Sequence, residues 1–216
     1  MTKLLKKEFI LTGSILSYLF ILFSLMAFIP SYPILVGAFF VCLGILYTFQ
    51  FAREYNDVLY TALLPINKCD TVKARYLFVI CIQMVSLVLT AIVVAIRMTL
   101  LKDAVPYAEN LLMNANMAYL GYFFVVLAMF NIIFLAGFFK TAFYYGKWFI
   151  IFCIVTFVVV SIGETLHHLP NLGSLNALSG DVSLQLIVLA FGAVLYIAGT
   201  AISLKLSIKR FENIDL

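Results

Sequence analysis

Glu164, His167 and His168 come nearer to a metal site than any other residues of this chain, by type and spacing. Glu164 and His168 are four residues apart, so on a helix they would share one face, and a carboxylate with imidazoles can bind zinc. The segment E-T-L-H-H matches neither H-E-x-x-H nor the inverted H-x-x-E-H arrangement, and the sequence places no third ligand beside it. We therefore expect no metal here and interpret the segment as a polar helix end.

Nucleotide-binding chemistry is also missing from the sequence. A Walker A loop needs G-x-x-x-x-G-K-S/T, in which backbone amides and the lysine surround the phosphates. Neither Gly137 nor Gly146 begins such a sequence. We expect no catalytic residue and no cofactor bound by this chain.

The elements that carry these residues are predicted to be membrane-spanning helices. Of the 216 residues, 65% are hydrophobic and only 11% are charged, which excludes an ordinary soluble protein. Several apolar runs reach the roughly 18 to 20 residues that a helix needs to cross hydrocarbon. We predict an all-α polytopic membrane protein with one transmembrane domain over residues 1–216. Its six spans are expected at residues 13–29, 34–51, 76–96, 118–139, 148–162 and 184–204.

Polar residues inside the predicted spans are few and uncharged, with Gln50, Gln83 and Asn131 the main ones. An ion-coupled carrier is expected to hold carboxylates or histidines at mid-membrane, so this pattern disfavours secondary active transport. Gln50 and Asn131 are candidates for the lining of a translocation path. The alternative, which we favour, is that they form hydrogen bonds between helices.

Positive charge predicts the orientation of the chain. Six spans put both termini on one side, and 12 of the 14 Lys and Arg residues fall on that side, leaving only Arg97 and Lys102 opposite. Lys and Arg mark the cytoplasmic face of membrane proteins. We therefore expect both termini in the cytosol, in the plasma membrane of a bacterium.

The first twelve residues carry Lys3, Lys6 and Lys7, interleaved with apolar side chains. This pattern favours an N-terminal interfacial helix on an anionic membrane surface, before the first span. The alternative is a basic start that only sets the topology of the first span.

The longest polar interruption, residues 52–75, separates the second and third predicted spans. Apolar residues recur there at helical spacing, at Tyr55, Leu59, Ala62, Leu63 and Ile66. This predicts a short amphipathic helix, which Pro65 should stop. Asn67 is then a candidate N-cap for the next helix, with Asp70 in the capping-box position.

The same stretch carries a resemblance to a known family. It reads E-Y-x-x-x-L-Y-x-x-L-L-P-I-x-K-x-D-x-V-x-A-R-Y-L from Glu54 to Leu77, and with six spans around it the chain resembles the permease subunits of ABC-2-type ATP-binding-cassette exporters. The matching residues are Glu54, Leu63, Leu64, Pro65, Ile66, Lys68, Asp70, Val72, Arg75, Tyr76 and Leu77.

The resemblance implies a cytoplasmic coupling helix at about Tyr55–Leu64, seated in a groove of a separate ATPase subunit. The residues expected to couple the two subunits are Glu54, Tyr55, Val58, Leu59, Ala62, Leu63, Leu64 and Pro65. ATP and magnesium would then be bound by the partner ATPase. A second permease copy, identical or related, would complete the transporter. The alternative for this stretch is an ordinary solvated connector.

The cargo implied by the resemblance is an amphipathic peptide of toxin or antimicrobial type, because permeases of this small group resemble exporters of such peptides, including the phenol-soluble modulin exporters. A lipid or hydrophobic drug is the alternative cargo. Two other classes remain open: a membrane-embedded enzyme, which the missing catalytic residues disfavour, and a non-transporting scaffold or immunity protein, which would need no ATPase.

Overall fold

The computed structural model describes residues 2–63, 66–108, 111–141, 144–180 and 182–214, and all regular structure within these ranges is helical. The long helices are α3 (Val36–Glu54), α5 (Lys68–Thr99), α7 (Met117–Met129), α9 (Gly146–Leu166) and α10 (Ser183–Glu212). The shorter α-helices are α1 (Thr2–Lys7), α2 (Ile15–Leu19), α4 (Asp57–Leu63), α6 (Val105–Ala108) and α8 (Ala136–Thr141). The irregular ones are η1 (Glu8–Thr12), η2 (Phe20–Phe28), η3 (Phe130–Leu135) and η4 (Gly173–Asn176).

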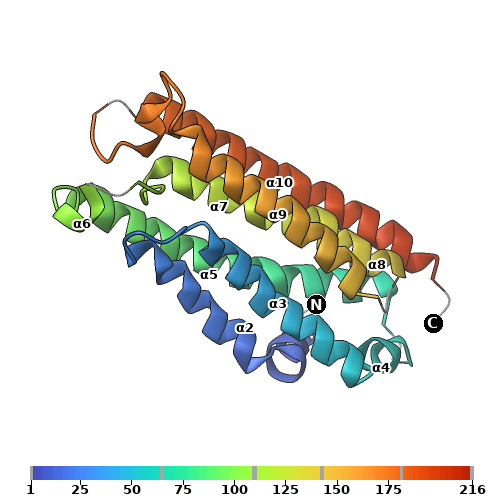
Figure 1. Ribbon diagram of the computed structural model, residues 1–216. Coiled ribbons are helices and arrows are strands. Elements are labelled where there is room, and N and C mark those ends of the chain that lie inside the picture. Colours follow the sequence, from blue (N-terminus) through green and yellow to red (C-terminus); the bar gives the residue numbers. More distant parts are fainter. Residues whose placement is uncertain (1, 64–65, 109–110, 142–143, 181, 215–216) are drawn as a thin grey trace.

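The long helices form an elongated bundle of two layers (Figure 1). One layer holds α2 with η2, α3 and α5, and the other holds α7 with its continuation into α8, α9 and α10. Helix α4 and the C-terminus lie at one end of the bundle and α6 lies at the other. We call these the α4 end and the α6 end.

Five helices of the described residues are long and apolar enough to cross a membrane. They include the continuous rod Met117–Thr141, and a sixth candidate is the pair Thr2–Thr12 and Ile15–Phe28, which is bent by 94°. The structure therefore supports a polytopic all-α membrane protein with five to six spans. The predicted count of six depends on how the bent pair is counted.

The first predicted span, residues 13–29, is not a regular α-helix. After the five residues of α2, the chain continues for nine residues as the 3-10 helix η2. A 3-10 helix rises about 2.0 Å per residue against about 1.5 Å for an α-helix, so this 14-residue segment reaches about 25 Å. The extended winding thus lets a short segment cover most of the roughly 30 Å of hydrocarbon.

Two of the other helices are longer than their predicted spans. Helix α5 has 32 residues and α10 has 30, which correspond to about 48 and 45 Å of helix. The first turns of α5 lie inside the stretch 52–75, where the sequence predicts a helix that begins after Asn67. Asn67 does occupy the N-cap position of α5, but its side chain makes no capping hydrogen bond.

Helices α7 and α10 approach so closely that their backbones touch. A Cβ atom added to Gly192 would collide with the backbone oxygen of Gly121, and one added to Gly121 would lie 2.7 Å from the Val188 carbonyl carbon. Small residues of this kind allow close packing of helices within a membrane. The sequence analysis did not identify this contact.

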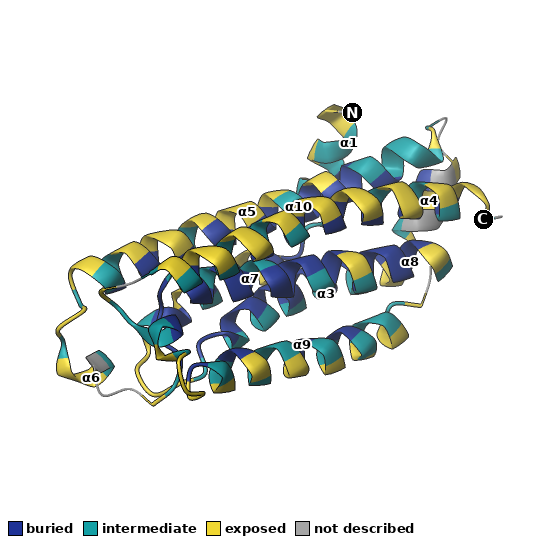
Figure 2. Cartoon of the chain, turned by 90° about the horizontal axis from the view of Figure 1, so that it is seen from above, coloured by how far each residue is buried: buried dark blue, intermediate teal, exposed yellow. Residues whose placement is uncertain are grey.

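The core lies between the layers and is rich in phenylalanine. Phe49, Phe130 and Phe134 are fully buried, and Phe134 packs edge-on against Phe49 with ring centroids 5.1 Å apart. Figure 2 shows buried residues along α3 and α7, with exposed ones along α5, α9 and α10. Only 17% of the apolar window of α9 is buried, against 67% for Met117–Thr141. Because α9 is apolar and largely exposed, it is expected to face lipid.

Replacing Gly192 with leucine should destabilise the bundle, because the new side chain meets backbone atoms that cannot move aside. We expect a loss on the order of 1–3 kcal/mol in the free energy of unfolding. Thermal unfolding of the detergent-purified protein, followed by size-exclusion chromatography, measures this loss of stability. Gly173→Ala is the control, because nothing lies within 4 Å of its added Cβ. Equal unfolding midpoints for both variants would contradict the close contact.

Candidate functional site

Helix α4 lies at one end of the bundle, outside the five long helices (Figure 1). The chain turns into it at Asn56, whose φ of 52° is in the left-handed region that asparagine tolerates better than most residues. The Asn56 carbonyl then accepts a hydrogen bond from the Tyr60 amide at 2.9 Å, so the turn continues directly into the helix. This geometry separates α4 from α3 with a single turn.

Two basic and two acidic side chains form a buried group beside α4. We call Lys7, Glu8, Asp57 and Arg75 the charged cluster. Lys7 Nζ lies 2.6 Å from Asp57 Oδ1, and Arg75 Nη2 lies 2.8 Å from Asp57 Oδ2. Arg75 Nε lies 2.9 Å from Glu8 Oε2. The side chains of Glu8 and Arg75 are only 1% and 5% exposed.

The charged cluster joins three parts of the chain that are distant in the sequence. Lys7 ends α1, Glu8 starts η1, Asp57 starts α4, and Arg75 lies two turns into α5. Lys7 also donates a hydrogen bond to Thr61 Oγ1 at 2.7 Å, one turn further along α4. The cluster has no net charge, so each buried ion is compensated, whereas losing one partner would leave a buried charge unpaired. A displacement of α4 must therefore act on both α5 and the N-terminal segment.

The amphipathic character of α4 is the reverse of that of an ordinary surface helix. Its polar residues Asp57 and Thr61, one turn apart, face the charged cluster. Tyr60 and Leu63, three residues apart, are 62% and 86% exposed. Tyr55, just before α4, is exposed as well. An apolar surface left open on this side is typical of a contact site for another molecule.

A second polar group lies half-way along the bundle. Gln83 and Asn131 exchange two side-chain hydrogen bonds, at 2.9 and 3.0 Å. Asn131 also donates to Thr200 Oγ1, and the Tyr196 hydroxyl donates to Gln83 Oε1, both at 2.9 Å. These buried residues come from α5, η3 and α10. The group therefore fastens three helices together at the level where unpaired amides would be most costly.

The α6 end of the bundle is closed by hydrogen-bonded loops. The buried Arg97 donates to Asn114 Oδ1 at 3.2 Å, and its guanidinium lies over the ring of Tyr107. The Asn114 amide donates to Asn176 Oδ1 at 2.6 Å, so the loop after α6 is joined to the loop after α9. These contacts hold the two loops together at this end of the bundle.

A family model described as ABC-2 family transporter protein matches residues 3–212. The chain belongs to this family. No curated protein and no solved structure matches it. The match confirms the expectation of an ABC-2-type permease and covers nearly all of the sequence. This ABC-2 family chain is thus an integral membrane component of a transporter.

The coupling residues predicted for this ABC-2 family chain fall in three places. Glu54 ends α3, where its carboxylate accepts a hydrogen bond from Gln50 Nε2 at 3.1 Å, and Tyr55 follows as the C-cap. Val58, Leu59, Ala62 and Leu63 belong to α4. Leu64 and Pro65 lie outside the described residues. The coupling role of these residues stays a prediction.

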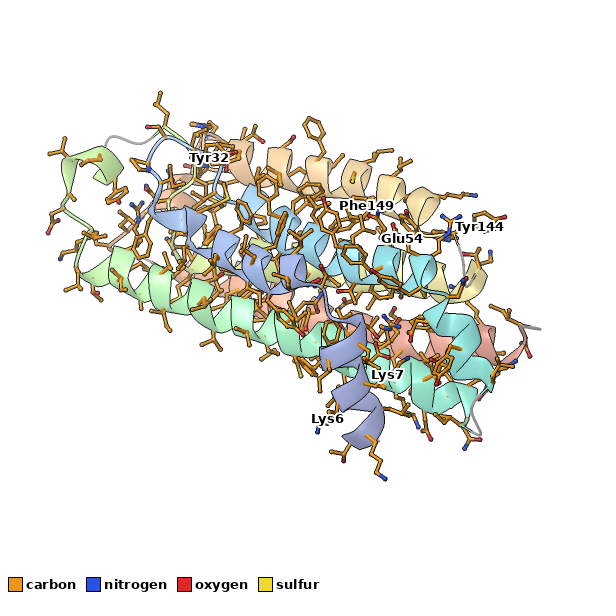
Figure 3. All side chains as sticks on the ribbon, turned by 90° about the horizontal axis from the view of Figure 1, so that it is seen from below. Lys6, Lys7, Tyr32, Glu54, Tyr144 and Phe149 are labelled. Carbon is orange, nitrogen blue, oxygen red and sulfur yellow. The ribbon has the colours of Figure 1, made fainter. Side chains whose placement is uncertain are left out.

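The three N-terminal lysines differ in their surroundings. Lys3 and Lys6 are exposed, as a membrane-surface helix requires. Lys7 instead turns into the charged cluster, with only 15% of its side chain exposed. Figure 3 shows Lys6 and Lys7 on the same short helix, which projects from the bundle. Lys7 thus joins the N-terminal segment to α4, a role that the sequence analysis did not assign to it.

The two residues predicted as candidates for a translocation path, Gln50 and Asn131, lie in different surroundings. Gln50 bonds to Glu54 within α3, near the α4 end, whereas Asn131 is fully buried in the mid-bundle group. Asn131 makes the interhelical hydrogen bonds that we favoured for it. A place on the translocation path stays a prediction for both residues.

Glu164 and His167 bind to the backbone of a neighbouring loop. Glu164 Oε2 accepts the Met113 amide at 2.9 Å, and His167 Nε2 lies 3.3 Å from the Leu111 carbonyl oxygen. Among the described residues, no three His, Cys, Asp or Glu side chains gather as a metal site would need. The segment ends α9, as expected of a polar helix end.

The sequence analysis missed Glu8, Asp57 and Thr61 as site residues. Arg75 was noted only as one letter of the shared motif. Asp57 and Arg75 are visible as charged residues near the ends of the polar stretch 52–75, but nothing local indicates that they pair with Lys7 and Glu8.

Removing one member of the charged cluster should destabilise the protein much more than removing a surface charge. For Arg75→Met we expect a loss of about 3–5 kcal/mol, because Glu8 and Asp57 would share Lys7 alone. The Glu8→Gln/Arg75→Met double variant should regain much of it, since the Lys7–Asp57 pair remains neutral. Thermal unfolding in detergent measures all three proteins.

Lys73→Met is the matched control for this series. Lys73 lies 3.9 Å from Asp70, and both side chains are exposed, so its loss should cost no more than about 1 kcal/mol. A double variant that is no more stable than Arg75→Met would show that charge balance does not hold the cluster together.

Proposed function

We propose that this chain is the transmembrane permease subunit of an ATP-driven ABC-2-type exporter, and that α4 is its coupling helix. The observation that carries the proposal is the connection of α4 to two other elements through the charged cluster. A separate ATPase subunit binds the exposed face of α4, and its movement is transmitted to α5 and the N-terminal segment. ATP and magnesium are bound by that ATPase.

The exposed face of α4 supports the docking role. Tyr60 and Leu63 present apolar surface away from the bundle, and Tyr55 extends it. Because Asp57 and Thr61 are held by Lys7, α4 cannot turn to bury these apolar residues against its own bundle without breaking buried ion pairs. The surface is therefore kept open for a partner.

The N-terminal segment fits an interfacial helix in this arrangement. Ile10, Leu11 and Ile15 are exposed and apolar near its bend, and Lys3 and Lys6 are exposed on α1. Apolar side chains beside lysines suit the boundary between headgroups and acyl chains. From the Lys and Arg content of the α4 end we propose that this end is cytosolic, with both termini in the cytosol. A second permease copy completes the transporter, in the plasma membrane of a bacterium.

Capture of the partner tests this proposal. Affinity-tagged protein isolated from its native membrane in mild detergent should carry an ATPase, measured as nucleotide hydrolysis by the eluate. The Tyr60→Glu/Leu63→Glu variant should lose most of that hydrolysis, because two carboxylates would interrupt the apolar contact. It should still insert into the membrane, since neither side chain is buried.

The control is Leu100→Glu/Leu111→Glu, which places the same charges on exposed leucines near the α6 end. It should retain the ATPase. Absence of hydrolysis from the wild-type eluate would favour the scaffold or immunity alternative, which has no such partner.

The cargo that we propose is an amphipathic peptide, with a lipid or hydrophobic drug as the alternative. The closed loops at the α6 end favour a cargo that leaves from within the membrane rather than through an open mouth. Both cargoes meet this condition.

Stimulation of nucleotide hydrolysis by the added cargo distinguishes a peptide from a lipid or hydrophobic drug. Hydrolysis by the purified complex should rise severalfold on addition of an amphipathic cationic helix-forming peptide. A response to added lipid or hydrophobic dye, with none to the peptide, would replace the peptide by the alternative cargo.

A further inference from the structure

A cavity of about 590 Å³ lies at the α4 end of the bundle, away from the charged cluster. Its walls come from the end of α3, from α8 and from the first turn of α9. Three of the lining residues, Arg53, Lys140 and Lys147, are basic, and none of the described lining residues is acidic. Tyr144 lines the same cavity, and Figure 3 shows it at this end, near Glu54.

The basic residues of this cavity differ from those of the charged cluster. In the cluster, Lys7 and Arg75 are each paired with carboxylates at short distance. Among the described residues, neither Arg53 nor Lys140 nor Lys147 makes an ion pair. The nearest carboxylate along the chain, that of Glu54, is bonded to Gln50 instead. The cavity therefore concentrates three positive charges without an anion from the protein.

Aromatic rings alternate with these charges. The Arg53 guanidinium lies 5.6 Å from the centre of the Tyr145 ring, and Lys147 Nζ lies 5.7 Å from that of Trp148. Trp148 Nε1 is buried and has no hydrogen-bond partner among the described atoms. This N–H is enclosed by protein rather than open to the cavity, so the three cations are the groups that would meet an anion.

The beginning of α9 adds to the same field. This 21-residue helix starts at Gly146 with no acidic residue in its first turn and no side-chain cap. Free amides at a helix N-terminus favour an anion, phosphate above all. Three cations and the N-terminus of α9 thus border one cavity.

We infer that this cavity binds the phosphate group of an anionic membrane lipid. The position of the cavity supports a lipid as the source of the phosphate. It lies where α3 and α8 end and α9 begins. Tyr and Trp side chains line it, as they do at the level of lipid headgroups. Basic pockets between helices on this side of a membrane bind acidic headgroups. The lipid would sit between α3 and α9, so it would connect the two layers of the bundle where they end.

Lipid titration of the full-length protein tests the inference. Phosphatidylglycerol is added to detergent-purified protein and binding is followed by native mass spectrometry, with phosphatidylcholine as the zwitterionic comparison. For the Arg53→Gln/Lys140→Gln/Lys147→Gln variant we expect roughly tenfold to hundredfold weaker binding of phosphatidylglycerol, since each basic residue near an anionic headgroup contributes about fivefold.

Two further variants keep the result interpretable. Lys102→Gln/Lys205→Gln/Lys209→Gln removes the same charge from exposed lysines outside the cavity and should bind as the wild type does. Arg53→Lys/Lys140→Arg/Lys147→Arg keeps the charge and should bind within a few-fold of the wild type.

Equal weakening in the cavity variant and the exposed-lysine variant would overturn the site, because it would show attraction by net charge alone. Equal binding of phosphatidylcholine and phosphatidylglycerol would overturn the choice of an anionic lipid. Displacement of the lipid by millimolar inorganic phosphate would also overturn it and assign the cavity to a soluble phosphate. Retained binding in the charge-keeping variant, with loss in the glutamine variant, supports the inference.

Discussion

The pairing of Asp57 with both Lys7 and Arg75 is the interaction on which the architecture of the α4 end depends. Burying four ions is unfavourable unless all four are compensated, so the cluster forms only when α1, α4 and α5 are all in place. This makes a seven-residue helix, too short to be stable alone, a fixed part of the bundle. It also explains why Tyr60 and Leu63 of α4 are exposed, because the polar side of this helix is already occupied.

The three polar groups described above lie at three levels along the bundle, and each is held by a different kind of contact. Ion pairs hold the α4 end, a neutral amide and hydroxyl group fastens the middle, and backbone and asparagine contacts close the α6 end. The middle uses Gln83 and Asn131 rather than charges, as expected where no water can compensate them. Movement carried from α4 along α5 would therefore reach Gln83 before it reached the closed loops.

The apolar runs of the sequence predicted the long helices well, because α3, α5, α9 and α10 each carry enough consecutive apolar residues to span a membrane. The short helix of residues 57–63 also follows from spacing at Leu59, Ala62 and Leu63. Other features have no local signature. Residues 15–28 are apolar apart from Ser17, Tyr18 and Ser24, so nothing in them distinguishes a 3-10 from an α-helix. Glu8 and Arg75 are 67 positions apart, and Lys7 looks like any lysine near a membrane surface. Gly121 and Gly192 meet only after two spans have been packed.

The nine-residue η2 has a mechanical consequence for the N-terminal segment. Rewinding it into an α-helix would shorten it by about 4.5 Å, since each residue would rise about 0.5 Å less. Such a contraction would draw the bend at residues 13–14 along the bundle axis, and it would have to move Phe20 and Phe23, which lie against Gly44 and Gly37 of α3. The winding of η2 therefore sets how far the first crossing reaches, by nearly the height of one α-helical turn.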